Sequence, residues 1–139
     1  MELADTSAWW VADRDTAGAL RDEFVHRLVT RRLAICDMVR FELLLSARNG
    51  REMADTAAEL AAVPDCPIGK AQWQRALWVY QRLGDQGGAH HRSVGSPDLL
   101  IAAAAEAAGA TVLHYDEDYE RIAEITGQPT RWIVPRGSL

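Results

Sequence analysis

The chain has 139 residues, the usual size of one domain, and its 48% hydrophobic and 25% charged residues exclude a disordered chain. Its net charge of −5 is opposite in sign to that of a simple nucleic-acid-binding module. No apolar run approaches the ~18 residues of a membrane span, and Asp5 and Asp13 interrupt any signal peptide. We therefore expect a single domain over residues 1–139, without a membrane partner, in the reducing cytoplasm.

Short apolar segments alternate with amphipathic ones along the chain. From the N-terminus we expect a strand, two helices, a strand and two helices, at 1–4, 8–12, 16–30, 32–36, 38–47 and 51–62. A very short strand within 64–69 is followed by a helix at 70–83 and a glycine-rich loop at 84–96. The chain closes with a helix, a strand, a helix and a strand at 99–108, 111–115, 117–125 and 130–134. This alternation predicts an α/β fold with a parallel sheet.

Four carboxylates from distant stretches are expected at one edge of this sheet. Asp5 and Asp116 each follow a predicted strand directly, and Glu42 lies one turn into the helix after the second strand. Asp98 lies in the first turn of its helix, and Asp118 is a fifth candidate. Such a cluster is tolerable when hard cations such as Mg²⁺ or Mn²⁺ hold it. Two such ions can activate water against a phosphodiester, which is the chemistry of a metal-dependent nuclease.

Each of these acids also has a purely structural interpretation. Asp5 is a common N-cap type, and Asp116 is a common turn residue. Asp98 and Asp118 suit the positive end of a helix dipole. Glu42 could form a salt bridge to a nearby arginine. The joint placement of the acids, rather than any single one, therefore favours a metal site.

Four motifs occur in order along nearly the whole chain. They begin with Leu3-Ala4-Asp5-Thr6-Ser7, Arg40-Phe41-Glu42-Leu43, Ser96-Pro97-Asp98-Leu99 and Tyr115-Asp116-Glu117-Asp118-Tyr119. In this combination the chain resembles the PIN-domain ribonucleases, and within them the VapC toxins of bacterial type II toxin–antitoxin pairs. The abundance of arginine and alanine is typical of a mycobacterial or other actinobacterial member. Tyr115 departs from the pattern, since many members carry arginine or another polar residue there.

The resemblance implies a three-layer α/β/α sandwich with a short, mostly parallel, five-stranded sheet. It implies a Mg²⁺-dependent endoribonuclease, with Mn²⁺ as a possible substitute, that cleaves structured RNA (tRNA or rRNA). The implied partners are a VapB-type antitoxin and a second copy in a homodimer. The implied catalytic acids are Asp5, Glu42, Asp98 and Asp116. Of these, Asp5, Asp98 and Asp116 are implied metal ligands, and Asp118, Thr6 and Ser7 are secondary candidates.

The path of the RNA needs positive charge beside the acids, because RNA is a polyanion. Arginines are concentrated at 21–51, and the best candidates are Arg21, Arg27, Arg31 and Arg32, with Arg48, Arg51 and Arg92 next. Two other readings of the resemblance stay open: a housekeeping PIN-domain nuclease without an antitoxin, and a catalytically inactive PIN-like module that binds RNA or protein. A phosphatase of the haloacid-dehalogenase type would need a second aspartate where the chain has Ser7.

Overall fold

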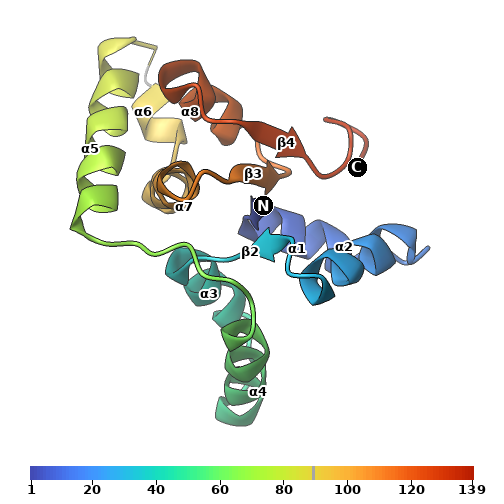
Figure 1. Cartoon of the computed structure of the whole chain (residues 1–139). Helices are drawn as coiled ribbons and strands as arrows, with labels where there is room; N and C mark the ends of the chain where they lie inside the picture. The colour runs from blue at the N-terminus through green and yellow to red at the C-terminus, as the bar shows by residue number, and fades with distance from the viewer. Residues whose placement is uncertain (89) are drawn as a thin grey trace.

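Four short strands form the centre of the molecule, in a computed structural model that describes residues 1–88 and 90–139 (Figure 1). All pairings are parallel, and the order across the sheet is β2-β1-β3-β4. The bounds are β1 Glu2–Ala4, β2 Leu33–Ala34, β3 Thr111–His114 and β4 Thr130–Trp132. The four main predicted strands are therefore present, each shorter than expected.

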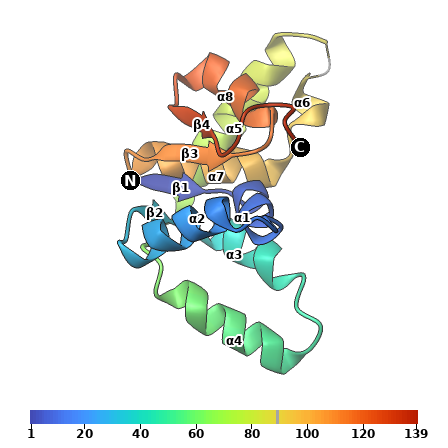
Figure 2. The ribbon, with the colours of Figure 1, turned by 90° about the vertical axis from the view of Figure 1, so that its right-hand side faces the viewer.

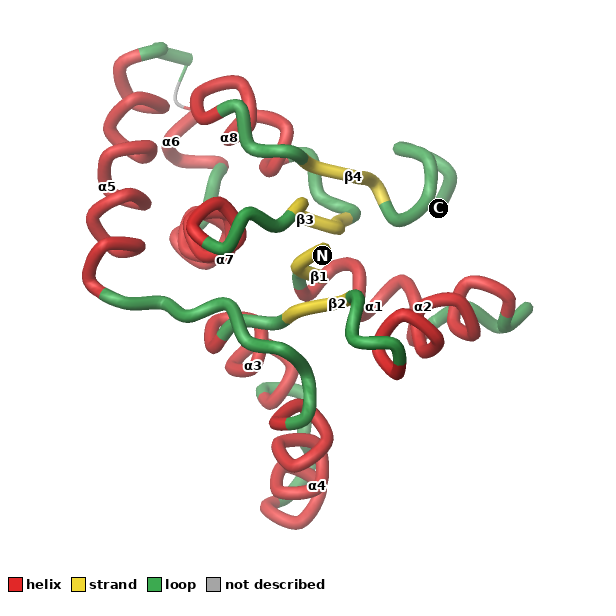
Figure 3. Tube along the Cα trace, in the orientation of Figure 1, coloured by secondary structure: helices red, strands yellow, loops and turns green. Residues whose placement is uncertain are grey.

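Eight helices in the described part of the chain surround this sheet (Figure 3). Their bounds are α1 Thr6–Asp13, α2 Ala19–Val29, α3 Asp37–Leu44, α4 Gly50–Ala61, α5 Lys70–Asp85, α6 His90–Ser93, α7 Ser96–Ala107 and α8 Asp118–Thr126. Figure 2 shows α4 projecting away from the sheet. None of the helices among the described residues is long and apolar enough to cross a membrane.

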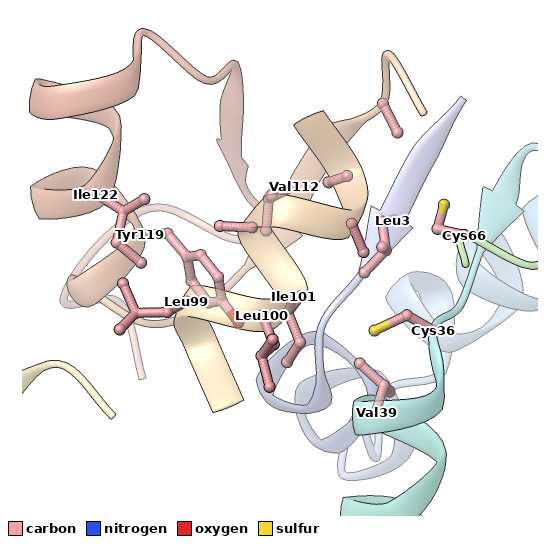
Figure 4. Packing of buried hydrophobic residues seen from close by; sticks show 14 of the residues in the cluster. Leu3, Cys36, Val39, Cys66, Leu99, Leu100, Ile101, Val112, Tyr119 and Ile122 are labelled. Atoms are coloured by element: carbon pink, nitrogen blue, oxygen red, sulfur yellow. The ribbon is translucent and has the colours of Figure 1, made fainter. Parts of the chain in front are cut away.

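The two faces of the sheet bury separate apolar clusters, because side chains alternate along a strand. Leu3 and Val112 point to the face covered by α3, α5, α7 and α8. Figure 4 shows this cluster, with Leu99 and Tyr119 among the side chains around Val112. Ala4 and Leu113 point to the other face, where they pack with residues of α1 and α2. The expected three layers are confirmed.

Two sequence predictions about the segments between helices are wrong. The strand expected within 64–69 is reduced to one bridge between Ile35 and Asp65, so the sheet of the described chain has four strands and not five. The Pro64 carbonyl and the Cys66 N–H form this bridge, but Pro64 has no N–H to continue it on one side, and α3 begins at Asp37 on the other. The loop expected at 84–96 contains α6, and α5 continues to Asp85 before Gly87, with a φ of +73°, ends the helical path.

Candidate functional site

Asp5 lies where β1 ends and α1 begins, and it is only 3% exposed. Its Oδ1 accepts hydrogen bonds from Ser7 Oγ at 2.7 Å and from the Ala8 N–H at 3.1 Å. Ser7 Oγ in turn accepts the N–H of Tyr115 at 2.8 Å, which ties the end of β1 to the end of β3. Burial raises the pKa of Asp5 to about 6, and the Asp116 charge acts in the same direction. Asp5 is therefore both the N-cap of α1 and part of a group of repelling acids.

Three further carboxylates converge beside Asp5. Asp98 comes from the first turn of α7, Asp116 from the turn after β3, and Asp118 is the first residue of α8. Each offers one oxygen, and these three oxygens lie within 4.8 Å of one another. Burial raises the pKa of Asp98 to about 8, and the charges of Asp116, Asp5 and Asp118 add to the effect. Burial and the Asp116 charge also raise the pKa of Asp118.

Glu42 reaches the same region from the second turn of α3. Thr6 Oγ1 donates to Glu42 Oε1 at 2.8 Å, so the residue after Asp5 holds this carboxylate. The alternative of a salt bridge is wrong for this residue, because Arg40 and Arg48 pair with other acids in the described structure. The sequence expectation that four distant stretches meet at the carboxyl ends of the strands is met by the geometry.

The PIN-domain family description matches residues 3–125, which is most of the chain. Ribonuclease VapC18 of Mycobacterium tuberculosis is 46% identical over 135 residues, covering 97% of this chain and 96% of that protein. Ribonuclease VapC21 of the same species is 41% identical over 112 residues and covers 76% of each chain. The chain belongs to the PIN-domain family, among the VapC ribonucleases.

Solved structures show the same fold. The DNA-bound VapBC of Salmonella typhimurium aligns with a TM-score of 0.73 at 18% identity, covering 96% of this chain and all of that one. VapBC-1 of nontypeable Haemophilus influenzae aligns with the same TM-score and identity, covering 95% and 97%. The α/β/α architecture of this PIN domain is therefore shared with proteins of very different sequence.

Two residues that contact the clustered acids of this PIN domain, Tyr119 and Arg121, were not predicted from the sequence. Tyr119 is 1% exposed, and its hydroxyl donates to Asp98 Oδ1 at 3.3 Å. Arg121 Nη1 donates to Asp118 Oδ1 at 3.2 Å and to Ser93 Oγ at 2.9 Å. In the sequence, Tyr119 stands out only as the last residue of the fourth motif. The rule that a buried hydroxyl needs a partner is the signal that could have drawn attention to it.

His114 fixes the backbone of the turn that carries Asp116. It is fully buried, and its Nδ1 accepts the Asp116 N–H at 3.1 Å. Burial lowers the pKa of His114, so the ring is neutral and its proton sits on Nε2, 3.1 Å from Glu120 Oε1. Thr130 Oγ1 donates to the same Glu120 oxygen at 2.7 Å. His114 is thus a structural histidine with both ring nitrogens bonded.

The arginines predicted to flank the acids are not brought to them. Arg27 pairs with Glu2, the first residue of β1, and the Arg32 carbonyl accepts the Glu2 N–H. Arg31 precedes β2 and donates to the Ala62 carbonyl at 3.3 Å. These three lie at the amino ends of the strands, whereas the acids lie at the carboxyl ends. Arg21, in α2, donates to the carbonyl of Asp13.

Proposed function

We propose that this PIN domain is a Mg²⁺-dependent endoribonuclease and the toxin of a type II toxin–antitoxin pair, with Mn²⁺ as a possible substitute. The observation that carries the proposal is the convergence of three carboxylate oxygens within 4.8 Å at the carboxyl edge of the sheet. Hard oxygen donors of this kind match the preference of Mg²⁺ and Mn²⁺. Burial and the neighbouring carboxylates raise the pKa values of Asp98 and Asp5, and a bound cation would offset this cost, which supports the proposal.

Asp98 and Asp116 are proposed to hold the ion, together with Asp5, and Asp118 is a further ligand. When bound, Mg²⁺ would stabilise charge on the phosphodiester and lower the pKa of a water molecule. Ser7 and the Ala8 N–H hold one oxygen of Asp5, which leaves its other oxygen for the site.

Glu42 is proposed to orient the attacking water. Its Oε1 accepts the Thr6 hydroxyl, so the carboxylate is held in one orientation and Oε2 is left to accept a hydrogen bond from water. Thr6 follows Asp5 directly, and this places Glu42 beside the proposed ligands although it comes from a different layer of the fold. Thr6 and Ser7 therefore act by positioning the acids.

The proposal is tested by measuring unfolding and RNA cleavage with and without divalent ions. A cation that binds only the folded protein stabilises it, by about 2.7 kcal/mol at one hundred times its dissociation constant. Mg²⁺ should therefore raise the melting temperature, and excess chelator should remove both this shift and the cleavage of a mixed tRNA and rRNA substrate. The matched control is Asp55→Asn, an exposed acid of α4, which should respond to Mg²⁺ like the wild type. Undiminished cleavage in excess chelator would end the metal proposal.

The antitoxin is the proposed partner, and the solved VapBC complexes support it as structural relatives. A VapB-type protein that places a basic side chain among the carboxylates would compete with Mg²⁺. Co-expression with the product of an adjacent short gene should give a stable complex that no longer cleaves RNA. A chain that cleaves RNA but has no such partner would instead be a housekeeping nuclease, and a chain that binds RNA without cleaving it would be an inactive module.

The cytoplasm is the proposed location, because the proposed substrates, tRNA and rRNA, are found there. A homodimer stays a prediction, and sedimentation of the purified chain tests it. Of the aromatic residues near the N-terminus that could contact a second copy, Trp9 is already used within the chain. Trp9 donates its indole N–H to the Ala4 carbonyl at 3.2 Å, and its ring lies 5.0 Å from that of Phe24.

A further inference from the structure

A cavity of about 490 Å³ lies between α2 and the sheet, on the face opposite to α3 and α7. Its volume is within the roughly 300–1,000 Å³ of small-molecule sites. Three arginines from distant parts of the chain line it: Arg27 in α2, Arg32 just before β2, and Arg131 in β4. Two of them belong to the stretch that the sequence marked for RNA binding.

Glu2 holds two of these arginines in fixed positions. Arg131 donates from Nε to Glu2 Oε2 at 2.7 Å and from Nη2 to Oε1 at 2.9 Å, and Arg27 also donates to Oε1. Burial alone would raise the pKa of Glu2, but the bonds and charges of Arg131 and Arg27 outweigh it, so the pKa lies below the ordinary value. One carboxylate thus neutralises one of two guanidinium charges and orients both groups.

Arg32 adds a third guanidinium whose side chain has no hydrogen-bonding or ionic partner among residues 1–88 and 90–139. Glu23 is the other acid that lines the cavity. The three arginines and two glutamates give the lining a charge of +1, on a chain whose net charge is −5. An anion is therefore attracted to this cavity, although most of the surface would repel it.

We propose that this cavity is a binding site for the phosphate group of a nucleotide-sized anion. Planar guanidinium groups bind phosphate oxygens through paired hydrogen bonds, and the two that Glu2 orients lose little conformational entropy on binding. The phosphate can come from a free nucleotide or from an RNA strand, since both carry the same group.

The cavity is separate from the carboxylate cluster. Glu2 begins β1 and Asp5 follows its end, which places them about 10 Å apart along the strand. Glu42 and Asp98 come from α3 and α7, whereas the cavity lies against α2 on the other face. A phosphate in the cavity is therefore not the one beside the proposed metal site, and its binding requires no divalent ion.

Calorimetric titration of the full chain with adenosine 5′-monophosphate in excess chelator tests the proposal. Binding is expected at low salt and should weaken as salt is added. Arg32→Ser should weaken it about tenfold or more, because a hydrogen-bonded charge is lost. The matched control is Lys70→Ser, an exposed cation at the start of α5, which should leave the affinity unchanged. Absence of binding at millimolar nucleotide, or equal weakening in both variants, would overturn the proposal.

A second variant is expected to strengthen nucleotide binding instead of weakening it. Glu23→Gln removes a negative charge from the lining and should tighten binding severalfold, a result that misfolding cannot mimic. Unchanged or weaker binding in folded Glu23→Gln would contradict the proposal. A 5′-phosphorylated oligoribonucleotide identifies the source: tighter binding than the mononucleotide, lost in Arg32→Ser, assigns the cavity to RNA. Equal or weaker binding assigns it to free nucleotides. Because no cleavage is measured, failure of the proposed nuclease activity would leave this result intact.

Discussion

The buried acidic side chains at the two ends of the sheet have pKa values shifted in opposite directions. At the amino end, Glu2 is almost buried, yet its pKa is lowered because Arg131 and Arg27 bond to it. At the carboxyl end, burial raises the pKa of Asp98 to about 8 and that of Asp5 to about 6, and neighbouring acids add to the increase. Burial acts in the same direction at both ends, so the difference comes from the partners.

This difference separates a structural ion pair from a binding site. The Glu2 group is satisfied within the chain, since two arginines supply more positive charge than it needs. Among the acids at the other end, the described structure gives one cation contact, from Arg121 to Asp118. The carboxyl end would therefore be stabilised by charge from outside, as protons or as the proposed metal ion, whose binding would be linked to folding.

The largest expected effect is on RNA cleavage at the carboxyl end. Asp98→Asn removes a proposed metal ligand and should lower the cleavage rate about a hundredfold to a thousandfold, since metal charge stabilisation is worth several kcal/mol. Asp116→Asn, Asp5→Asn and Glu42→Gln should show large losses of the same kind. Initial rates at saturating Mg²⁺ are the measurement, with Asp55→Asn as the control. Full activity in Asp98→Asn would mean that the start of α7 is not part of the site.

The next effect contrasts the stability of the two ends. Glu2→Gln leaves two guanidinium groups without their shared carboxylate and should lower the free energy of unfolding by about 1–3 kcal/mol, less than for a fully buried pair because Arg131 is exposed. Asp98→Asn should instead raise it in chelator, because folding no longer requires this buried carboxyl to take up a proton. Urea denaturation at pH 7 measures both. The comparison fails if the two variants change stability in the same direction.

The raised pKa values predict that the free energy of unfolding decreases as the pH rises. Asp98 has an ordinary pKa of 3.8 when unfolded and about 8 when folded, so the folded state holds a proton that the unfolded state releases between these values. In chelator, this contribution to stability falls as the pH rises from 3.8 towards about 8. Asp5 acts in the same direction, up to about pH 6. The contribution of Glu2 to stability depends on pH in the opposite direction. It is present at neutral pH and is lost only as the pH falls through the lowered pKa of Glu2.

Denaturation at pH 5 and at pH 8 isolates the Asp98 contribution. The wild type should lose more stability between these two pH values than Asp98→Asn, which has no titrating group at that position. Saturating Mg²⁺ should reduce the difference between the two proteins at pH 8, because the ion favours the ionised carboxylates. An identical pH dependence for both proteins in chelator would show that Asp98 does not carry a raised pKa.

Much of this comparison was visible in the sequence. Asp5 and Asp116 each follow a strand, and the rule that parallel strands end at one edge placed them together. The same rule puts Arg31 and Arg32 at the other edge, since they come before β2, but the need for charge near RNA outweighed it in the prediction. The prediction placed these arginines at the carboxyl edge of the sheet because RNA needs positive charge near the acids. The direction of the chain, which enters β2 after Arg31 and Arg32, places them at the amino edge.

Other features depend on contacts that sequence spacing does not contain. Asp118 was predicted only as a secondary site candidate, with a helix-dipole role as the alternative, and its carboxylate lies with those of Asp98 and Asp116. That both acids around Glu117 face the cluster depends on the turn, where Asp116 Oδ1 accepts the Asp118 N–H at 2.9 Å. The missing fifth strand likewise depends on local chemistry, namely a proline at the position where a ladder would continue.

The smallest expected effect concerns Tyr119, which connects α8 to α7 through Asp98. Burial and the nearby carboxylates raise the pKa of its hydroxyl, so it keeps its proton and donates to Asp98 Oδ1. The bond engages Oδ1 and would leave Oδ2 of Asp98 for the proposed ion. At 3.3 Å it is long for a hydroxyl donor, which limits its strength. Tyr119→Phe keeps the buried ring and removes only this contact.

We expect Tyr119→Phe to fold with a loss of about 0.5–1.5 kcal/mol and to cleave RNA up to about tenfold more slowly, at the lower end of effects for groups that orient metal ligands. A merely structural role would leave metal binding unchanged, so the deciding measurement is the Mg²⁺ concentration at the midpoint of thermal stabilisation. That midpoint should rise in Tyr119→Phe and stay constant in Tyr80→Phe, an exposed tyrosine of α5. If the midpoint stays constant in both variants, the Tyr119 hydroxyl makes only a structural hydrogen bond in the core. The orientation of Asp98 is then set by the start of α7 alone.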